Sequence, residues 1–446
     1  EEDVVEAFSL AALLERLDSD DGCGRWDAAA ALAQSAKKGD QEVVAALAMR
    51  LEEAQDGNVR RAALQALVQV ADKGDARAQA ALTFCLDDPD KDLRLVALRE
   101  LVLLAVKGNP RTIAAMIVAL EDADQGIRQT ALQGLVQLAE RGHQRVVVAL
   151  IAYAEGVEKA GRQAAMCALA QVAEKGDQQA VVAIIKHLED TDETVRLVAV
   201  QELVKVAEKG DKRTLASLTA HLQDFSTATR KAALHALAQV AVRGDQHVIA
   251  LLLARLEGAG EKDARQDALS ALGEVAGQND ERVVACLTAC LDQNDRCIKD
   301  AALLALAQIG GKGCERSVDA LGALKDQRDK DIKKAAMHAL CQVAEKGNAR
   351  AVRVLASCLK DTEWWMRQRV LKSLGQAAQK GNAHAVEALI PLLADADWSC
   401  RSAAVQALAQ AAAQGNAKAG TAVAACLEGS DVRLKDAAMK ATAQAE

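Results

Sequence analysis

The sequence predicts an all-α protein, an α-solenoid in which about thirteen helix pairs stack into a right-handed superhelix. Two observations support this fold class. A short motif of Lys or Arg, then Gly, then Asp or Asn returns every 34 residues, with two steps of 35, along the 446-residue chain. The composition is 51% hydrophobic but only 2% aromatic, so Ala, Leu and Val must supply the packing. β-branched and aromatic runs of period two, which would indicate strands, are absent.

The glycine of this motif marks the end of each repeat. Glycine adopts the left-handed conformation that commonly ends a helix, and Asn is the next best residue there. A preceding Lys or Arg complements the helix dipole, and a following Asp or Asn can cap the next helix. We call this motif the joint and assign it a structural role. The series is Gly39, Gly74, Gly108, Gly142, Gly176, Gly210, Gly244, Asn279, Gly313, Gly347, Gly381 and Gly415.

The repeat from Asp177 to Gly210 shows two helical stretches between joints. Residues 178–188 carry an apolar face, residues 189–192 form a polar turn, and residues 194–209 carry a second apolar stripe of helical period. Two helices of this size cannot bury both faces alone, but stacked neighbours can. Even the Arg-Gly-Asp tripeptide at residues 243–245 has these flanks, so we interpret it as a joint and not as an adhesion ligand.

Each second helix opens with a basic residue. In the same repeat, the residues that fall in register with the repeated pattern are Leu188, Asp190, Asp192, Val195, Arg196, Ala199 and Leu203. This pattern resembles HEAT repeats, most closely the HEAT-like repeats of phycobilisome lyases, and it covers essentially the whole chain as thirteen units. In that family Asp and Arg side chains form a ladder that links successive repeats. The turns at residues 155–156 and 226–229 lack the second Asp, so the ladder is not expected to continue regularly there. The basic series is Arg25, Arg60, Arg94, Arg128, Arg162, Arg196, Arg230, Arg265, Lys299, Lys333, Arg367, Arg401 and Lys435.

The tetratricopeptide array has the same 34-residue period but requires Trp and Tyr or Phe in every unit. One Tyr and three Phe in the chain exclude it.

Nothing in the sequence predicts catalysis, so we expect no enzyme, no catalytic residue and no cofactor. None of the seven His is followed by Glu, which argues against the di-iron hydroxylases built on HEAT-type repeats. No phosphate loop or nucleophile elbow occurs. No Cys or His cluster has the spacing of metal ligands, so no metal site is predicted.

The eleven cysteines are odd in number and form no CxxC pair, which favours an intracellular, reducing compartment, cytoplasmic or organellar. Four of them, Cys85, Cys290, Cys358 and Cys426, precede Leu at one repeat position, where a small buried hydrophobe is expected. His187 and His221 share that position.

The net charge and the hydropathy pattern limit the classes of partner that the chain is expected to bind. The net charge of −8 disfavours sequence-independent nucleic-acid binding and, with it, a HEAT-like repair protein. No run of 18 apolar residues exists, so no direct membrane insertion is expected. The remaining class of partner is one or more proteins.

One feature departs from the repeat. Trp364 and Trp398 lie 34 residues apart, at a position that is mostly polar or small elsewhere, and Trp365 is adjacent. Exposed Trp is enriched at interface hot spots, so we predict that these three residues contact a partner protein. The alternative is that they pack over the turns and stabilise them.

We therefore expect residues 1–446 to form a single continuous array within a longer chain. The predicted function is that of a non-enzymatic scaffold or adaptor in a larger assembly. The alternative is a chaperone or enzyme that handles a bilin chromophore or other cofactor, as the resemblance to phycobilin lyases implies. No tetrapyrrole-handling residue can be carried over from that family, and spectral titration with a bilin would separate the two.

Overall fold

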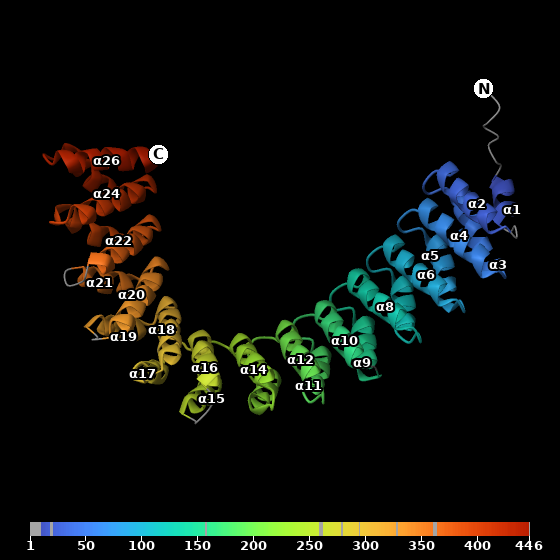
Figure 1. Cartoon of the computed structure of the whole chain (residues 1–446), viewed down its shortest axis with the longest axis horizontal. Helices are drawn as coiled ribbons and strands as arrows, with labels where there is room; N and C mark the ends of the chain where they lie inside the picture. The colour runs from blue at the N-terminus through green and yellow to red at the C-terminus, as the bar shows by residue number, and fades with distance from the viewer. Residues whose placement is uncertain are drawn as a thin grey trace, which may run out of the picture. The chain divides into compact units, whose positions relative to one another are not determined.

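The computed structural model describes residues 10–17, 21–156, 158–257, 262–277, 280–293, 295–326, 329–359 and 364–445. Within these ranges the chain forms 26 α-helices in antiparallel pairs and no strand (Figure 1). The predicted all-α solenoid of helix pairs is thus confirmed. No helix in the described ranges is long and apolar enough to cross a membrane. The chain divides into two compact units, Glu1–Glu208 and Lys209–Glu446.

The N-terminal unit contains twelve α-helices and one 3₁₀ helix in its described part. Their bounds are α1 Leu10–Leu17, α2 Gly22–Ser35, α3 Gln41–Glu53, α4 Gly57–Val70, α5 Ala76–Phe84, η1 Cys85–Asp87, α6 Lys91–Leu104, α7 Pro110–Ala119, α8 Gln125–Leu138, α9 Gln144–Gly156, α10 Lys159–Val172, α11 Gln178–His187 and α12 Glu193–Val206.

The C-terminal unit continues the same alternation. Its described helices are α13 Lys212–Ala220, η2 His221–Gln223, α14 Thr227–Val240, α15 Gln246–Glu257, α16 Lys262–Val275, α17 Glu281–Cys290, α18 Arg296–Gly311, α19 Glu315–Ala323, η3 Leu324–Asp326, α20 Lys330–Glu345, α21 Ala349–Cys358, α22 Trp364–Gln379, α23 Ala383–Leu389, η4 Ile390–Ala394, α24 Trp398–Ala413, α25 Ala417–Glu428 and α26 Val432–Ala445.

In each unit the odd-numbered helices form one layer and the even-numbered helices another. Successive even-numbered helices pack side by side, as α6 does on α8 and α16 on α18, and each also packs on the odd-numbered helix of its own repeat. Between the layers runs a core of buried aliphatic side chains, such as Leu98 and Leu101 of α6 and Met116 of α7. Every repeat therefore buries its apolar faces against its neighbours.

Where Asp or Asn follows a joint glycine, its side chain caps the next helix, as the sequence indicates, whereas Cys314 at the start of α19 forms no side-chain capping hydrogen bond. The side chain of Asp75 accepts hydrogen bonds from the backbone N–H groups of Arg77 and Ala78, each at 2.9 Å. Asn348 does the same for Arg350 and Ala351, at 2.9 and 3.1 Å. These contacts satisfy N–H groups that have no partner inside the helix.

The joint glycines adopt the left-handed conformation. Gly176, Gly210 and Gly244 have φ of +89°, +81° and +82°, and the other eight joint glycines also have positive φ. Within the described ranges no other residue type has positive φ. Asn279, the one predicted joint residue that is not Gly, lies outside the described residues.

The joints fall into two groups by the acceptor of the glycine N–H. From Gly39 to Gly244, the N–H donates to the last carbonyl of the next repeat's even-numbered helix; for Gly176 this is Val206 O at 2.6 Å. From Gly313 to Gly415 it donates back into its own helix, as Gly347 does to Ala344 O at 2.8 Å. Asn348 N–H then reaches Val343 O at 3.4 Å, which completes a Schellman motif. We call the first group forward joints and the second group Schellman joints.

The five residues that end in the joint glycine do not determine whether a joint is a forward joint or a Schellman joint. Residues 172–176 and residues 343–347 both read Val-Ala-Glu-Lys-Gly. In the first copy the helix ends at Val172 and Ala173 is extended, with ψ of 146°. In the second the helix continues to Glu345, and Lys346 has ψ of 1°. The packing of neighbouring repeats must therefore select the conformation.

Candidate protein-binding surface

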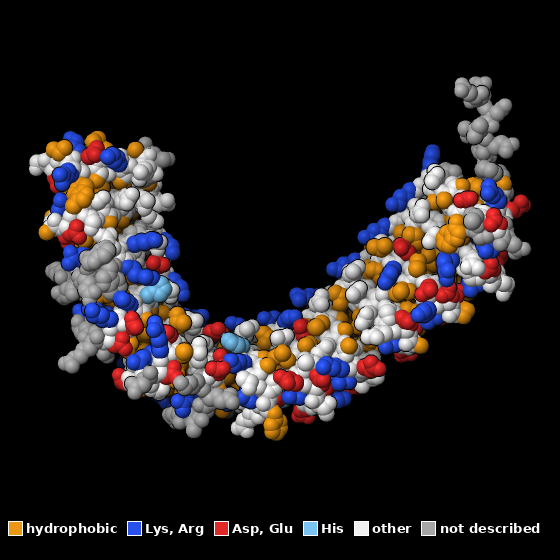
Figure 2. Space-filling model, viewed as in Figure 1, with side chains coloured by type: hydrophobic (Ala, Val, Ile, Leu, Met, Phe, Trp, Pro, Cys, Tyr) orange, Lys and Arg blue, Asp and Glu red, His pale blue; other side chains and the backbone are white. Residues whose placement is uncertain are grey.

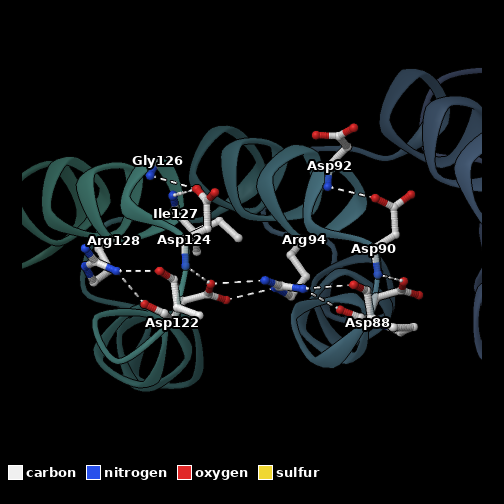
Figure 3. Close-up of polar contacts among 11 residues, drawn as sticks. Asp88, Asp90, Asp92, Arg94, Asp122, Asp124, Gly126, Ile127 and Arg128 are labelled. Carbon is white, nitrogen blue, oxygen red and sulfur yellow. Dashed lines mark hydrogen bonds and ion pairs between the residues drawn. The ribbon is translucent and has the colours of Figure 1, made fainter.

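The repeated Arg and Asp form an inter-repeat ladder, and its clearest rung joins α6 to the turn before α8 (Figure 3). Arg94 donates from Nε and Nη2 to the two carboxylate oxygens of Asp122, at 2.9 and 3.1 Å. Its Nη1 donates to the backbone carbonyls of Asp88 and Pro89, at 2.9 and 3.3 Å. One arginine thus holds its own turn and the next repeat's turn.

In the same rung, opposing effects act on the pKa of the Asp122 carboxyl group. Burial raises the pKa of Asp122, but hydrogen bonds from Arg94 and from the N–H of Asp124 outweigh it, so the pKa lies below its ordinary value. Asp122 is therefore held as the carboxylate that the rung requires.

The residues that the sequence singled out in the sixth repeat have the same arrangement. Asp190 lies 2.8 Å from Arg162 Nε of the preceding repeat and accepts from the N–H of Asp192 at 2.9 Å. Asp192 caps α12 by accepting from Thr194 N–H at 2.8 Å. Arg196 Nη1 donates to the carbonyl of Asp190 at 2.9 Å. These residues hold the repeat together, which is the structural role assigned to them.

The rung is interrupted where the sequence departs from the pattern. Arg128 still donates to the carbonyls of Asp122 and Ala123, both at 2.8 Å. Its Nε is buried without a hydrogen-bond partner in the described part of the chain, because Gly156, the last residue of α9, stands where other repeats have the ladder Asp. At the second departure Ser226 replaces Asp as the cap of α14, accepting from Thr229 N–H at 3.2 Å.

The shared Cys and His position is a packing position. Cys85, Cys290, Cys358 and Cys426 are all buried, and burial raises the pKa of the Cys85 thiol to about 12. His187 is also buried, and burial lowers its pKa. Among the described residues, no group of three or more His, Cys, Asp or Glu lies close enough to hold a metal ion.

The Arg-Gly-Asp tripeptide is a joint. Gly244 N–H donates to Val275 O at 2.7 Å. The carboxylate of Asp245 accepts from the N–H groups of His247 and Val248, at 3.0 and 3.2 Å, and so caps α15. Its acidic group is engaged inside the fold.

The structure describes the side chain of only one of the three predicted partner-binding tryptophans. Trp398 is the first residue of α24 and 37% exposed, and the Arg401 guanidinium lies 5.3 Å from its ring centroid. This contact fits the alternative of packing over the turn, and the exposure leaves ring surface for a partner. Trp364 and Trp365 begin α22, and their side chains lie outside the described part.

A second surface, which the sequence analysis missed, lies on the odd-numbered helices of the N-terminal unit. Met49, Phe84 and Val118 are 56%, 54% and 67% exposed. Each is ten residues after its joint glycine, in three consecutive repeats. The position elsewhere holds Ala, Lys, Ser or Pro, so a comparison of repeats position by position could have found it. We call these three residues the apolar row.

The comparisons with known proteins agree with this architecture. The family described as HEAT repeats matches residues 10–102, 147–238, 181–273, 249–341, 323–409 and 352–443. No curated protein matches the chain.

Solved structures resemble the chain in fold. Importin beta in a polyethylene glycol condition is 14% identical, with a TM-score of 0.55 over 97% of this chain and 69% of that one. Kap121p bound to Nup53p is 12% identical, with a TM-score of 0.52 over 98% and 52%. Kap95p, in a structure with RanGDP, is 12% identical, with a TM-score of 0.51 over 98% and 66%. The chain thus spans between about half and two thirds of the length of these proteins, and identities this low show the fold alone. The closer resemblance to phycobilisome-lyase repeats stays a prediction, but the match over most of the sequence shows that the chain belongs to the HEAT-repeat family.

Proposed function

We propose that this protein is a non-enzymatic scaffold that binds partner proteins on the exposed side chains of its repeats. The observation that carries the proposal is the apolar row of Met49, Phe84 and Val118, which is exposed in three consecutive repeats. Apolar side chains exposed to water at one position of neighbouring repeats are candidates for protein interaction, because large exposed apolar surfaces commonly mark such sites.

The contrast between repeating and non-repeating residues supports this function. Joint glycines, capping Asp and Asn residues and the ladder arginines recur through the array, and their contacts hold repeats together. The apolar row does not recur, and its side chains make no contribution that every repeat needs. Solenoids of stacked helix pairs present long surfaces of this kind to partners.

The structural neighbours include proteins with protein partners. Kap121p is bound to Nup53p in one of the solved structures, and the Kap95p structure concerns RanGDP. The fold is therefore one on which protein binding occurs, and we extend that class of activity, without those particular partners, to this chain.

We further propose that Trp364, Trp365 and Trp398 form a second contact for a partner. Trp398 carries this part of the proposal because it remains partly exposed above Arg401. Tyr, Trp and Arg are the residues most often found at the energetic centre of interfaces.

The proposal is tested by replacing the apolar row in the full chain. In the test variant Met49, Phe84 and Val118 each become Gln. The control variant places Gln at Ala220, Ala254 and Ala289, which are exposed at the same repeat position in three other consecutive repeats. Proteins retained from the native source are quantified by mass spectrometry. We expect the test variant to lose proteins that wild type and control both retain; equal retention by all three would contradict the proposal.

A further inference from the structure

A groove of about 910 Å³ lies between α5 and α7 of the N-terminal unit. Its lining is mostly apolar and includes Val106 and Val118, which are 50% and 67% exposed. Lys107 and Arg111 lie at the edge formed by the joint. Three features combine at this place: a departure from the repeat at Gln79, a local scarcity of acidic residues, and an exposed apolar surface.

The first feature is in the floor of the groove. Gln79 is five residues after its joint glycine, a position that holds Val, Leu or Ile in ten of the other eleven repeats. Its side chain is only 6% exposed. Nε2 donates to Leu104 O at 3.2 Å, while Oε1 accepts from Asn109 Nδ2 at 2.7 Å and Thr112 Oγ1 at 3.4 Å. A satisfied buried polar network of this kind fixes geometry, and here it ties α5 to the joint and to α7.

The second feature is the local scarcity of acidic residues. The preceding joint carries Asp72 and Asp75 beside its glycine, whereas the corresponding residues here are Val106 and Asn109. From residue 104 to residue 118 the only charged side chains are Lys107 and Arg111. Both are exposed, and neither forms an ion pair with a described residue. The groove therefore ends in two cations that form no ion pair among the described residues. The carboxylate of Glu140 borders the same joint, since a Cβ on Gly108 would lie 3.3 Å from its Oε1.

The third feature is the apolar surface beside these cations. Val118 faces solvent ten residues after the joint glycine, and Val106 replaces an acid two residues before it. Figure 2 shows hydrophobic side chains interspersed with Lys and Arg along the N-terminal unit. Apolar area with cations at one edge complements a segment that is apolar along its length and acidic at one end.

We propose that the α5–α7 groove binds a short segment of a partner protein, with aliphatic or aromatic side chains against Val106 and Val118 and carboxylates on Lys107 and Arg111. The inference rests on the proposed function and adds the place and the chemistry of the partner. A nucleic acid would need a broader positive field than two cations, and the apolar lining offers nothing to its phosphates.

The test selects binding peptides from a random peptide library displayed on phage, with the full chain as bait. Dissociation constants of the enriched peptides are then measured for wild type and three variants. The first is Lys107→Glu with Arg111→Glu, and the second is Val118→Glu. The control is Lys209→Glu with Arg213→Glu, which changes the same residue types at the same positions of another joint. All of these positions are exposed, so each variant should fold as wild type does. Circular dichroism of each variant checks this.

We expect enriched peptides to share apolar residues followed or preceded by Asp or Glu. Their affinity should fall about tenfold or more in the first two variants, weaken with salt, and stay within about twofold in the control. Enrichment of basic or uncharged peptides, or equal affinity in all variants, would overturn the groove proposal while leaving a protein-binding function in place. If no peptide is enriched, and if every surface variant retains the same partner proteins as wild type, both the groove proposal and the proposed protein-binding function are overturned. Salt-dependent binding of a labelled oligonucleotide that requires Lys107 and Arg111 would replace the peptide with a nucleic acid.

Discussion

Arg94 and Asp122, 28 residues apart in sequence, form a two-pronged ion pair with N–O distances of 2.9 and 3.1 Å. The pair joins the even-numbered helix of one repeat to the turn of the next. Arg128, which is the corresponding arginine one repeat later, keeps its contacts to its own turn, but its Nε has no forward partner among the described residues. A comparison of substitutions at Arg94 and Arg128 therefore distinguishes the contribution of the inter-repeat ion pair to stability from that of the hydrogen bonds within the turn.

Replacing Arg94 by Lys should lower the free energy of unfolding by about 1–3 kcal/mol, because Lys cannot form the two-pronged contact and the carboxylate of Asp122 is largely buried. Arg128→Lys should cost clearly less. Urea unfolding and hydrogen exchange of the backbone N–H groups in α6 and α8 measure the difference. Equal costs for the two substitutions would show that the rung contributes nothing.

Two glycines with nearly the same backbone conformation test the two groups of joint. Gly176 and Gly347 have φ of +89° and +91°. A Cβ at Gly176 would lie 2.6–2.8 Å from side-chain atoms of Glu208, whereas a Cβ at Gly347 would meet nothing within 4 Å. Gly347→Ala should therefore cost about 1–2 kcal/mol from backbone strain alone.

Gly176→Ala should cost more than Gly347→Ala, because it adds the contact with Glu208 to the same strain. The excess should disappear when Glu208→Ala is added, since the obstructing side chain is then removed. Thermal unfolding of the single and double variants measures both terms. An unchanged melting temperature for Gly176→Ala or the bulkier Gly176→Val would contradict the joint's role.

His187 gives the array a dependence on pH. Burial lowers the pKa of His187 below its ordinary value, so the unfolded chain binds this proton more readily than the folded one. The stability that the neutral side chain contributes is complete above pH of about 6.5 and is lost as the pH falls through the lower, folded-state pKa. His187→Cys places there the residue that four other repeats use and removes the titration. Wild type should lose stability relative to this variant only below about pH 6.5, and parallel pH profiles would refute the assignment.

Substitutions at Trp398 and Arg401 distinguish a stabilising role of the Trp398 ring from a role in partner binding. Trp398→Ala removes the contact with Arg401 and should cost about 0.5–1 kcal/mol of stability, as exposed cation–π pairs do. If the ring also contacts a partner, as we propose, retention of that partner falls as well. Arg401→Gln breaks the same cation–π contact but leaves the indole, so it serves as the control. Equal partner retention by wild type and Trp398→Ala would remove Trp398 from the interface.

The repeating part of this fold could be predicted from sequence because each repeated residue answers a local backbone requirement. Gly176 and the equivalent glycines mark the joint at which one repeat ends. The spacing of Asp190 and Arg196 shows where the second helix of a repeat begins. The group to which a joint belongs could not be predicted, since identical pentapeptides at residues 172–176 and 343–347 adopt different conformations. That choice depends on how whole repeats pack.

The groove could have been suspected from the sequence but not built from it. Gln79 in a position otherwise aliphatic is a visible signal, yet its partners Asn109 and Thr112 come from the next repeat and are identified only by the packing of α5 on α7. Likewise, a comparison of repeats singles out Val118 by its position, but only the structure shows that its side chain faces solvent. Sequence periodicity therefore identifies what repeats share, and the departures acquire meaning only in three dimensions.

A partner protein binds, in our proposal, at the α5–α7 groove, where Gln79 departs from the repeat. This proposal is tested most directly by placing a photo-crosslinking amino acid at Val118 in the full chain, and at Ala254, an exposed residue at the same position of another repeat, as the control. After irradiation in extract of the native source, the crosslinked peptides are identified by mass spectrometry. We predict adducts at Val118 whose sequences combine apolar residues with Asp or Glu, and no such adducts at Ala254. The same adducts at both positions, or none at Val118 when partners are retained, would contradict the account.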